Sequence, residues 1–122
     1  MAKSCSIVIP CFNESGAIEK TIREILFALQ PDWIKTTEVV VVNDGSTDGS
    51  KETLEQLSME LSDQPLRVIH HSRNLGYGAA LKTGVRRSNA ELICITDADG
   101  TYPNQRFPEL LDLGEQHDMV VG

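Results

Sequence analysis

The chain has 122 residues, of which 40% are hydrophobic and 24% are charged, and this composition is typical of one compact domain. It contains 11 Lys and Arg residues against 18 Asp and Glu residues, so its formal net charge is −7. Such acidity argues against non-specific nucleic-acid binding and against attachment to an anionic membrane surface, because both depend on basic side chains. An anionic ligand would therefore need a metal cation or backbone donors. No apolar run approaches the ~20 residues of a membrane span.

Five short apolar runs predict five strands in chain order. They cover residues 5–10, 38–43, 66–70, 92–96 and 119–122. The second run is almost continuously β-branched, which indicates a strand covered on both faces, as in a parallel sheet.

Apolar residues at helical spacing lie between these runs and predict four helices. The apolar positions of the first run from Ile18 to Leu29, with Ser15 as its N-cap and Pro31 just after its end, and those of the second are Leu54, Leu57 and Leu61. Leu81 and Val85 mark the third, and residues 107–113 form a short fourth. The capping candidates of the second helix are Ser46, Thr47 and Asp48.

The alternation of strands and helices predicts right-handed crossovers and a doubly wound α/β domain, with a largely parallel sheet and helices on both faces. Ligands of such domains bind beyond the carboxyl ends of the strands. The segments at those ends are residues 10–14, 43–46, 72–76 and 97–100, and three of the four carry a carboxylate. We expect all of these segments to face one crevice.

Asp97-Ala98-Asp99 is the sharpest feature at this edge. Two carboxylates near a diphosphate would repel it unless a divalent cation intervened, and Mg²⁺ or Mn²⁺ favour oxygen ligands and accept phosphate in their coordination shell. Acidic turns are common, so the pair alone is weak evidence. Its place after a buried strand, beside two other acidic edges, favours a metal and diphosphate site.

Two other carboxylates have both a structural and a functional interpretation. Asp44 begins a turn in which Gly45 takes a positive φ, and a carboxylate fixed at that strand end can also accept a hydrogen bond from a ligand. Glu14 favours the first turn of a helix and equally allows contact with a sugar hydroxyl or a base. The interpretations are compatible with one another.

Several other features favour structural roles. Gly76-Tyr77-Gly78 indicates a tight turn that opens the third helix and not a nicotinamide site, because Leu81 stands where that motif needs its third glycine. His70 and His71 lack a metal-ligating partner at suitable spacing. The three cysteines, which contain no C-x-x-C pair, are expected to be buried thiols.

Four blocks of sequence together resemble the family 2 glycosyltransferases of GT-A fold. These blocks cover residues 7–14, 39–48, 74–78 and 97–103, they stand in the family's order and spacing, and they extend over nearly the whole chain. The last block is most similar to the polyprenyl-phosphate branch, which includes dolichyl-phosphate mannosyltransferase. The resemblance implies a Rossmann-like GT-A sheet and a nucleotide-sugar donor with UDP or GDP.

The resemblance also implies site residues. It places Pro10, Phe12 and Glu14 in the nucleotide pocket, and Val42 and Asp44 at the base. It places Asp97 and Ala98 at the ribose and the phosphates, and Asp99 at a Mg²⁺ or Mn²⁺ ion bound to the diphosphate. One departure is Thr101, which stands where close relatives have Gln and would be a weaker metal ligand.

The family's members are longer, so residues 1–122 are expected to be a single domain, the donor-binding half of a truncated three-layer enzyme. The resemblance implies that the acceptor-binding half and the general base lie beyond Gly122, that transfer is inverting and metal-assisted, and that this half alone is inactive. The acceptor would be polyprenyl phosphate or a glycan. The expected location is cytoplasmic, and the whole enzyme would associate with the cytoplasmic side of a membrane. Apolar surface left by truncation would favour homo-oligomers. The alternatives are a non-catalytic α/β fragment and a receiver-like signalling domain.

Overall fold

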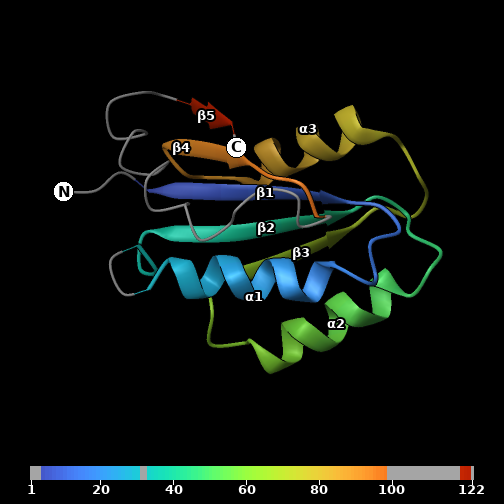
Figure 1. The fold of residues 1–122 in the computed structure, drawn as a ribbon. Helices are drawn as coiled ribbons and strands as arrows, with labels where there is room; N and C mark the ends of the chain where they lie inside the picture. Colours follow the sequence, from blue (N-terminus) through green and yellow to red (C-terminus); the bar gives the residue numbers. More distant parts are fainter. Residues whose placement is uncertain (1–3, 31–32, 99–118, 122) are drawn as a thin grey trace.

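A computed structural model of the protein describes residues 4–30, 33–98 and 119–121. The elements in chain order are β1 (Cys5–Cys11), α1 (Ile18–Ala28), β2 (Thr37–Asn43), α2 (Ser50–Glu60), β3 (Leu66–His70), α3 (Tyr77–Arg87), β4 (Leu92–Ile95) and β5 (Met119–Val121) (Figure 1). The five strands lie within one residue of their predicted bounds, so this part of the sequence prediction is confirmed. The predicted helix at residues 107–113 lies outside the described residues. Among the described helices, none combines the length and the hydrophobicity needed to cross a bilayer.

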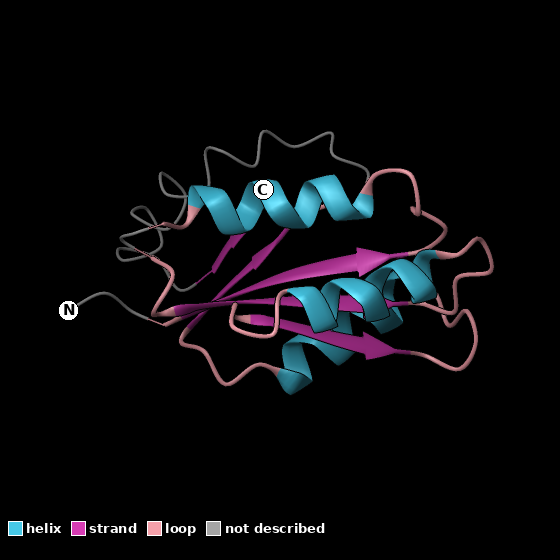
Figure 2. Ribbon diagram, turned by 90° about the horizontal axis from the view of Figure 1, so that it is seen from below, coloured by secondary structure: helices cyan, strands magenta, loops and turns pink. Residues whose placement is uncertain are grey.

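The strands form one sheet in the order β3-β2-β1-β4-β5, and each neighbouring pair is parallel. Helices α1 and α2 cover one face and α3 covers the other, which gives three layers (Figure 2). This arrangement confirms the doubly wound α/β fold. The carboxyl ends of β1 to β4 therefore meet along one edge, and the strand order reverses between β1 and β4.

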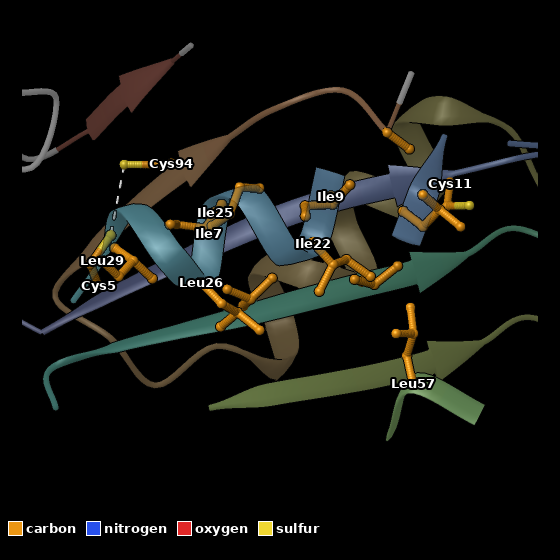
Figure 3. Close-up of a cluster of buried hydrophobic side chains, with 14 of the residues drawn as sticks. Cys5, Ile7, Ile9, Cys11, Ile22, Ile25, Leu26, Leu29, Leu57 and Cys94 are labelled. Atoms are coloured by element: carbon orange, nitrogen blue, oxygen red, sulfur yellow. Dashed lines mark hydrogen bonds between the residues drawn. The ribbon is translucent and has the colours of Figure 1, made fainter. Parts of the chain in front are cut away.

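The larger core lies between the sheet and helices α1 and α2 (Figure 3). Alternate residues of β1 point into it, and α1 contributes the face that carries Ile18, Ile22 and Ile25. All three cysteines are free and buried, as predicted, and the sulfur atoms of Cys5 and Cys94 lie 3.7 Å apart. These thiols fill core volume, as unpaired cysteines commonly do.

Helix α3 contacts the sheet differently from the prediction. Its buried residues are Ala80 and Gly84, whereas Val85 is 43% exposed and does not face the core. A Cβ atom at Gly84 would lie 2.4 Å from Cγ1 of Val8. The helix therefore packs so closely on β1 that the small residues, and not the large apolar ones, mark its inner face.

The predicted caps were partly wrong. Helix α1 begins after Ala17 without a side-chain cap, and Ser15 instead donates its backbone N–H to Asp48 Oδ2 at 3.0 Å. The N-cap position of α2 is Gly49, and Asp48, one residue before it, accepts the backbone N–H of Ser50, the first residue of the helix, at 3.0 Å. One carboxylate thus joins the starts of two helices.

Candidate functional site

Two loops at the carboxyl edge are joined by side-chain hydrogen bonds. Asn13, in the loop after β1, takes a positive φ of 54° and accepts the backbone N–H of Thr47 on Oδ1 at 2.8 Å. Its own backbone N–H donates to Ser46 Oγ at 3.0 Å. The loops after β1 and β2 are therefore held together, and this fixes the position of Phe12, which directly precedes Asn13, at this edge.

Two neighbouring cavities open at this edge, and both are lined by Pro10, Phe12 and Tyr77. We call the first the loop cavity; it has a volume of about 230 Å³, and its further lining residues are Cys11, Asp44, Asn74, Gly76 and Ala80. We call the second the acidic cavity; it has a volume of about 310 Å³, and its further lining residues are Glu14, Asp97 and Ala98. The structure thus brings together six predicted site residues from three strand ends.

The acidic cavity contains two of the predicted carboxylates, Glu14 and Asp97. Burial and the neighbouring charge of Asp97 raise the pKa of Tyr77, which stays a neutral phenol at physiological pH. Ala98 is buried, and its carbonyl accepts the hydroxyl of Thr21 from α1 at 3.2 Å, which fixes the chain as it leaves β4.

The carboxylate oxygens of this cavity are of the type that Mg²⁺ and Mn²⁺ prefer. No cluster of three or more potential metal ligands occurs within the part of the chain that the structure describes. Asp99 and Thr101, which the sequence connects with the metal, lie outside the described residues. The donor chemistry of Glu14 and Asp97 fits a hard cation, and the metal site stays a prediction.

The two residues expected at the base are both buried. Val42 is 0% exposed and packs with Val40 and Ala80 beneath α3. Asp44 is 3% exposed, and Gly45 beside it takes the predicted positive φ, at 70°. Their contact with a base stays a prediction.

The carboxylate of Asp44, which lines the loop cavity, has three hydrogen-bond partners within the protein. Its Oδ1 accepts the backbone N–H of Leu75 and faces His71 Nδ1, both at 2.9 Å, and its Oδ2 accepts the backbone N–H of Gly76 at 2.9 Å. Burial alone would raise the pKa of Asp44, but the hydrogen bonds from His71, Leu75 and Gly76 outweigh it and lower the pKa. Asp44 is therefore ionised at neutral pH.

His71 is a residue whose contacts sequence reasoning missed. The prediction of a structural role was correct, but nothing in the pattern connected His71 with Asp44 or with Thr83 of α3, whose hydroxyl lies 2.8 Å from Nε2. The available signal was positional, because β2 and β3 are neighbours and each of these residues directly follows its strand.

A larger hollow, of about 650 Å³, runs along the outer side of α1 and contains none of the predicted site residues. Another, of about 570 Å³, lies at the amino ends of the strands. Size therefore does not select the site, and the carboxyl edge is chosen because the sequence motifs meet there.

The comparisons with known proteins identify the family. The family model "Glycosyl transferase family 2" matches residues 6–122. The chain is 34% identical over 120 residues to an undecaprenyl-phosphate 4-deoxy-4-formamido-L-arabinose transferase of Pseudomonas syringae, covering 98% of this chain and 35% of that protein. It is 33% identical over 111 residues to the dolichyl-phosphate beta-glucosyltransferase ALG5C of Trichomonas vaginalis, covering 86% of this chain and 32% of that protein.

Among solved structures, the mannosyltransferase PcManGT of Pyrobaculum calidifontis, in complex with GDP-Man and Mn²⁺, matches with a TM-score of 0.76 and 28% identity. The match covers 87% of this chain and 30% of that one. The likeness confirms the predicted GT-A sheet. The chain spans about a third of the length of the curated relatives that it matches.

Proposed function

Because the chain belongs to glycosyl transferase family 2, we propose that it forms the donor-binding half of a glycosyltransferase that uses a nucleoside-diphosphate sugar. One observation carries the proposal: the motif residues that follow β1 and β4, far apart in the sequence, line the same acidic cavity. The two adjoining cavities together have the size and the mixed apolar and polar lining of a small-molecule site.

In this proposal Pro10, Phe12 and Glu14 line the nucleotide pocket. Asp97 and the backbone at Ala98 face the ribose and the phosphates. The shared lining of the acidic cavity supports this division, and the complex of PcManGT with GDP-Man supports the class of donor.

We assign Asp99 as the ligand of Mg²⁺ or Mn²⁺, with Asp97 beside it. A bound divalent cation would neutralise the charge that develops on the departing nucleoside diphosphate. The net charge of −7 supports this assignment, because an acidic protein needs a cation to accept an anionic donor. The presence of Mn²⁺ in the PcManGT complex supports it as well.

The names of the curated relatives favour a polyprenyl phosphate as the acceptor. An acceptor oxygen would attack the anomeric carbon from the side opposite the departing diphosphate, so that the bond to the diphosphate breaks and the configuration inverts. The residues of this site bind and orient the donor in the proposal, and the general base is assigned to none of them.

Calorimetric titration of the chain with UDP and with GDP tests the proposal. We expect binding in the presence of Mn²⁺ that weakens about tenfold or more when the metal is chelated. Asp97→Asn and Asp99→Asn should each weaken the metal-dependent binding by about tenfold or more, because each removes a negative charge near the metal.

Asp63→Asn is the matched control, because this exposed carboxylate lies in the turn before β3, at the opposite edge of the sheet. It should leave the dissociation constant unchanged. Equal affinities with and without Mn²⁺, or unaltered binding in the Asp99→Asn variant, would contradict the proposed metal and donor site.

A further inference from the structure

The acidic cavity has an uneven supply of hydrogen-bonding side chains. Its carboxylates, Glu14 and Asp97, accept hydrogen bonds, and the side chains of Pro10, Phe12 and Ala98 form none. The remaining lining residue is Tyr77, whose phenol has an O–H group. Among the described residues that line this cavity, Tyr77 is therefore the one whose side chain donates.

The hydroxyl of Tyr77 is available to a ligand. The residue is 57% exposed, and within the described part of the chain no group forms a hydrogen bond with its Oη atom. Burial and the negative charge of Asp97 raise the pKa of the phenol, which keeps its proton at neutral pH. A proton donor without a protein partner thus faces two carboxylates that have no use for a further negative neighbour.

The backbone gives Tyr77 a fixed position between the two cavities. Tyr77 is the first residue of α3, and Gly76 before it donates its backbone N–H to Asp44 Oδ2 at 2.9 Å. The N–H of Ala80 closes the first turn on the carbonyl of Gly76 at 3.0 Å, and Ala80 is buried beneath the helix with Val42. Tyr77 lines both the loop cavity and the acidic cavity, so it stands where they adjoin.

The oxygens of a nucleoside diphosphate differ in what they need from such a cavity. A ribose hydroxyl has a proton, so it can donate to the carboxylate of Glu14 or Asp97. The diphosphate oxygens that carry the negative charge have only lone pairs, which a carboxylate repels, and they need a cation or an N–H or O–H donor. The phenol of Tyr77 therefore matches a phosphate oxygen, whereas the two carboxylates match the ribose and the cation.

We propose that Tyr77 binds the donor where the two cavities adjoin and that its hydroxyl donates a hydrogen bond to a phosphate oxygen. The inference rests on the proposed function and deepens it, because it adds a direct protein contact to the cation that neutralises the diphosphate. The sequence had indicated only a structural place for Tyr77, in the turn that opens the helix.

Tyr77→Phe is the informative variant, because it removes the hydroxyl and keeps the ring. In the presence of Mn²⁺ we expect it to weaken the binding of UDP and GDP by about tenfold, since the lost hydrogen bond goes to a charged group. Tyr77→Ala, which removes the ring as well, should weaken both at least as much. Ser58→Ala removes a hydroxyl in the last turn of α2, away from both cavities, and should leave both affinities unchanged.

Uridine and guanosine locate the hydrogen bond, because they have the base and the ribose but no phosphate. Ligand-observed NMR titration should give the same dissociation constant for each nucleoside with the Tyr77→Phe variant as with the unmodified chain. Urea denaturation of the same variant should give an unchanged free energy of unfolding, since the hydroxyl has no partner within the described part of the chain.

The outcomes separate this inference from the proposed function. If the unmodified chain binds UDP or GDP and Tyr77→Phe binds them equally well, the inference is overturned and the donor site stands. An equal loss of affinity for the nucleosides and the diphosphates would also overturn it, because the hydroxyl would then contact the nucleoside. If the unmodified chain binds neither nucleotide, the proposed function fails, and the role of Tyr77 fails with it.

Discussion

At the scale of the residue, the proposed donor site contains a partly exposed aromatic side chain. Phe12 is 45% exposed and lines both cavities at the carboxyl edge. An exposed ring loses hydrophobic free energy unless a ligand covers it, and a nucleobase is a flat partner of suitable size. Phe27 is 84% exposed on the outer side of α1 and provides a comparison at a position without the motif.

We expect Phe12→Ala to weaken nucleoside-diphosphate binding by about tenfold or more, because stacking of a base on an aromatic ring is worth about 1–3 kcal/mol. Phe27→Ala removes the same side chain far from the cavities and should leave the affinity unchanged. Titration with GDP and UDP in the presence of Mn²⁺ measures both. Equal affinities for the two variants would contradict the placement of the nucleotide at Phe12.

At the scale of the element, helix α3 has two glycines with opposite surroundings. Gly84 faces β1, where a Cβ atom would overlap the side chain of Val8, whereas a Cβ atom at Gly78 would have no neighbour within 4 Å. The first glycine permits close packing of helix on sheet, and the second only weakens the helix. The loop that precedes α3 lines the loop cavity through Asn74 and Gly76, so the position of this helix also affects the site.

Gly84→Ala should lower the free energy of unfolding by about 1–3 kcal/mol, because an added methyl group in a packed core forces the neighbours to shift. Gly78→Ala should raise it by about 0.5–1 kcal/mol through helix propensity. Urea denaturation of the two variants measures both changes. If both variants were stabilised, the close contact between Gly84 and Val8 would be refuted.

The elements also show what the sequence could and could not predict. The strands are predictable because unbroken β-branched runs such as residues 39–42 are typical of buried parallel strands and rare in other secondary structure. The inner face of α3 was not predictable, because Ala80 faces β2 and Gly84 faces β1 at distances that allow only small residues, and no helical period encodes those distances. The predicted cap of α1 was wrong because Ser15 is held by a tertiary contact: its hydrogen-bond partner is Asp48, 33 residues away.

The site was predictable to the extent that it follows from topology. Residues just after parallel strands meet at one edge, so the proximity of Glu14 and Asp97 could be expected. The hydrogen bonds of Asp44 could not be predicted, because the backbone N–H groups of Leu75 and Gly76 donate them and leave no mark on the sequence.

At the scale of the whole molecule, the net charge sets the conditions for binding. A protein of charge −7 repels a nucleoside diphosphate at a distance, and the carboxylates of Glu14, Asp44 and Asp97 repeat that sign around the cavities. Salt screens such repulsion, since the Debye length shortens from ~30 Å at ~0.01 M to ~10 Å at ~0.1 M.

Added salt should therefore tighten binding in the absence of metal, the opposite of its effect on proteins that bind phosphates with basic side chains. Between those two salt concentrations, with a chelator present, we expect the dissociation constant for GDP to fall by about twofold or more. With Mn²⁺ bound, the change should be smaller, because the cation cancels part of the local negative charge. The same titration at both salt concentrations checks this. Binding that weakens with salt in the absence of metal would mean that basic side chains dominate the potential at the site, and it would contradict the need for a cation.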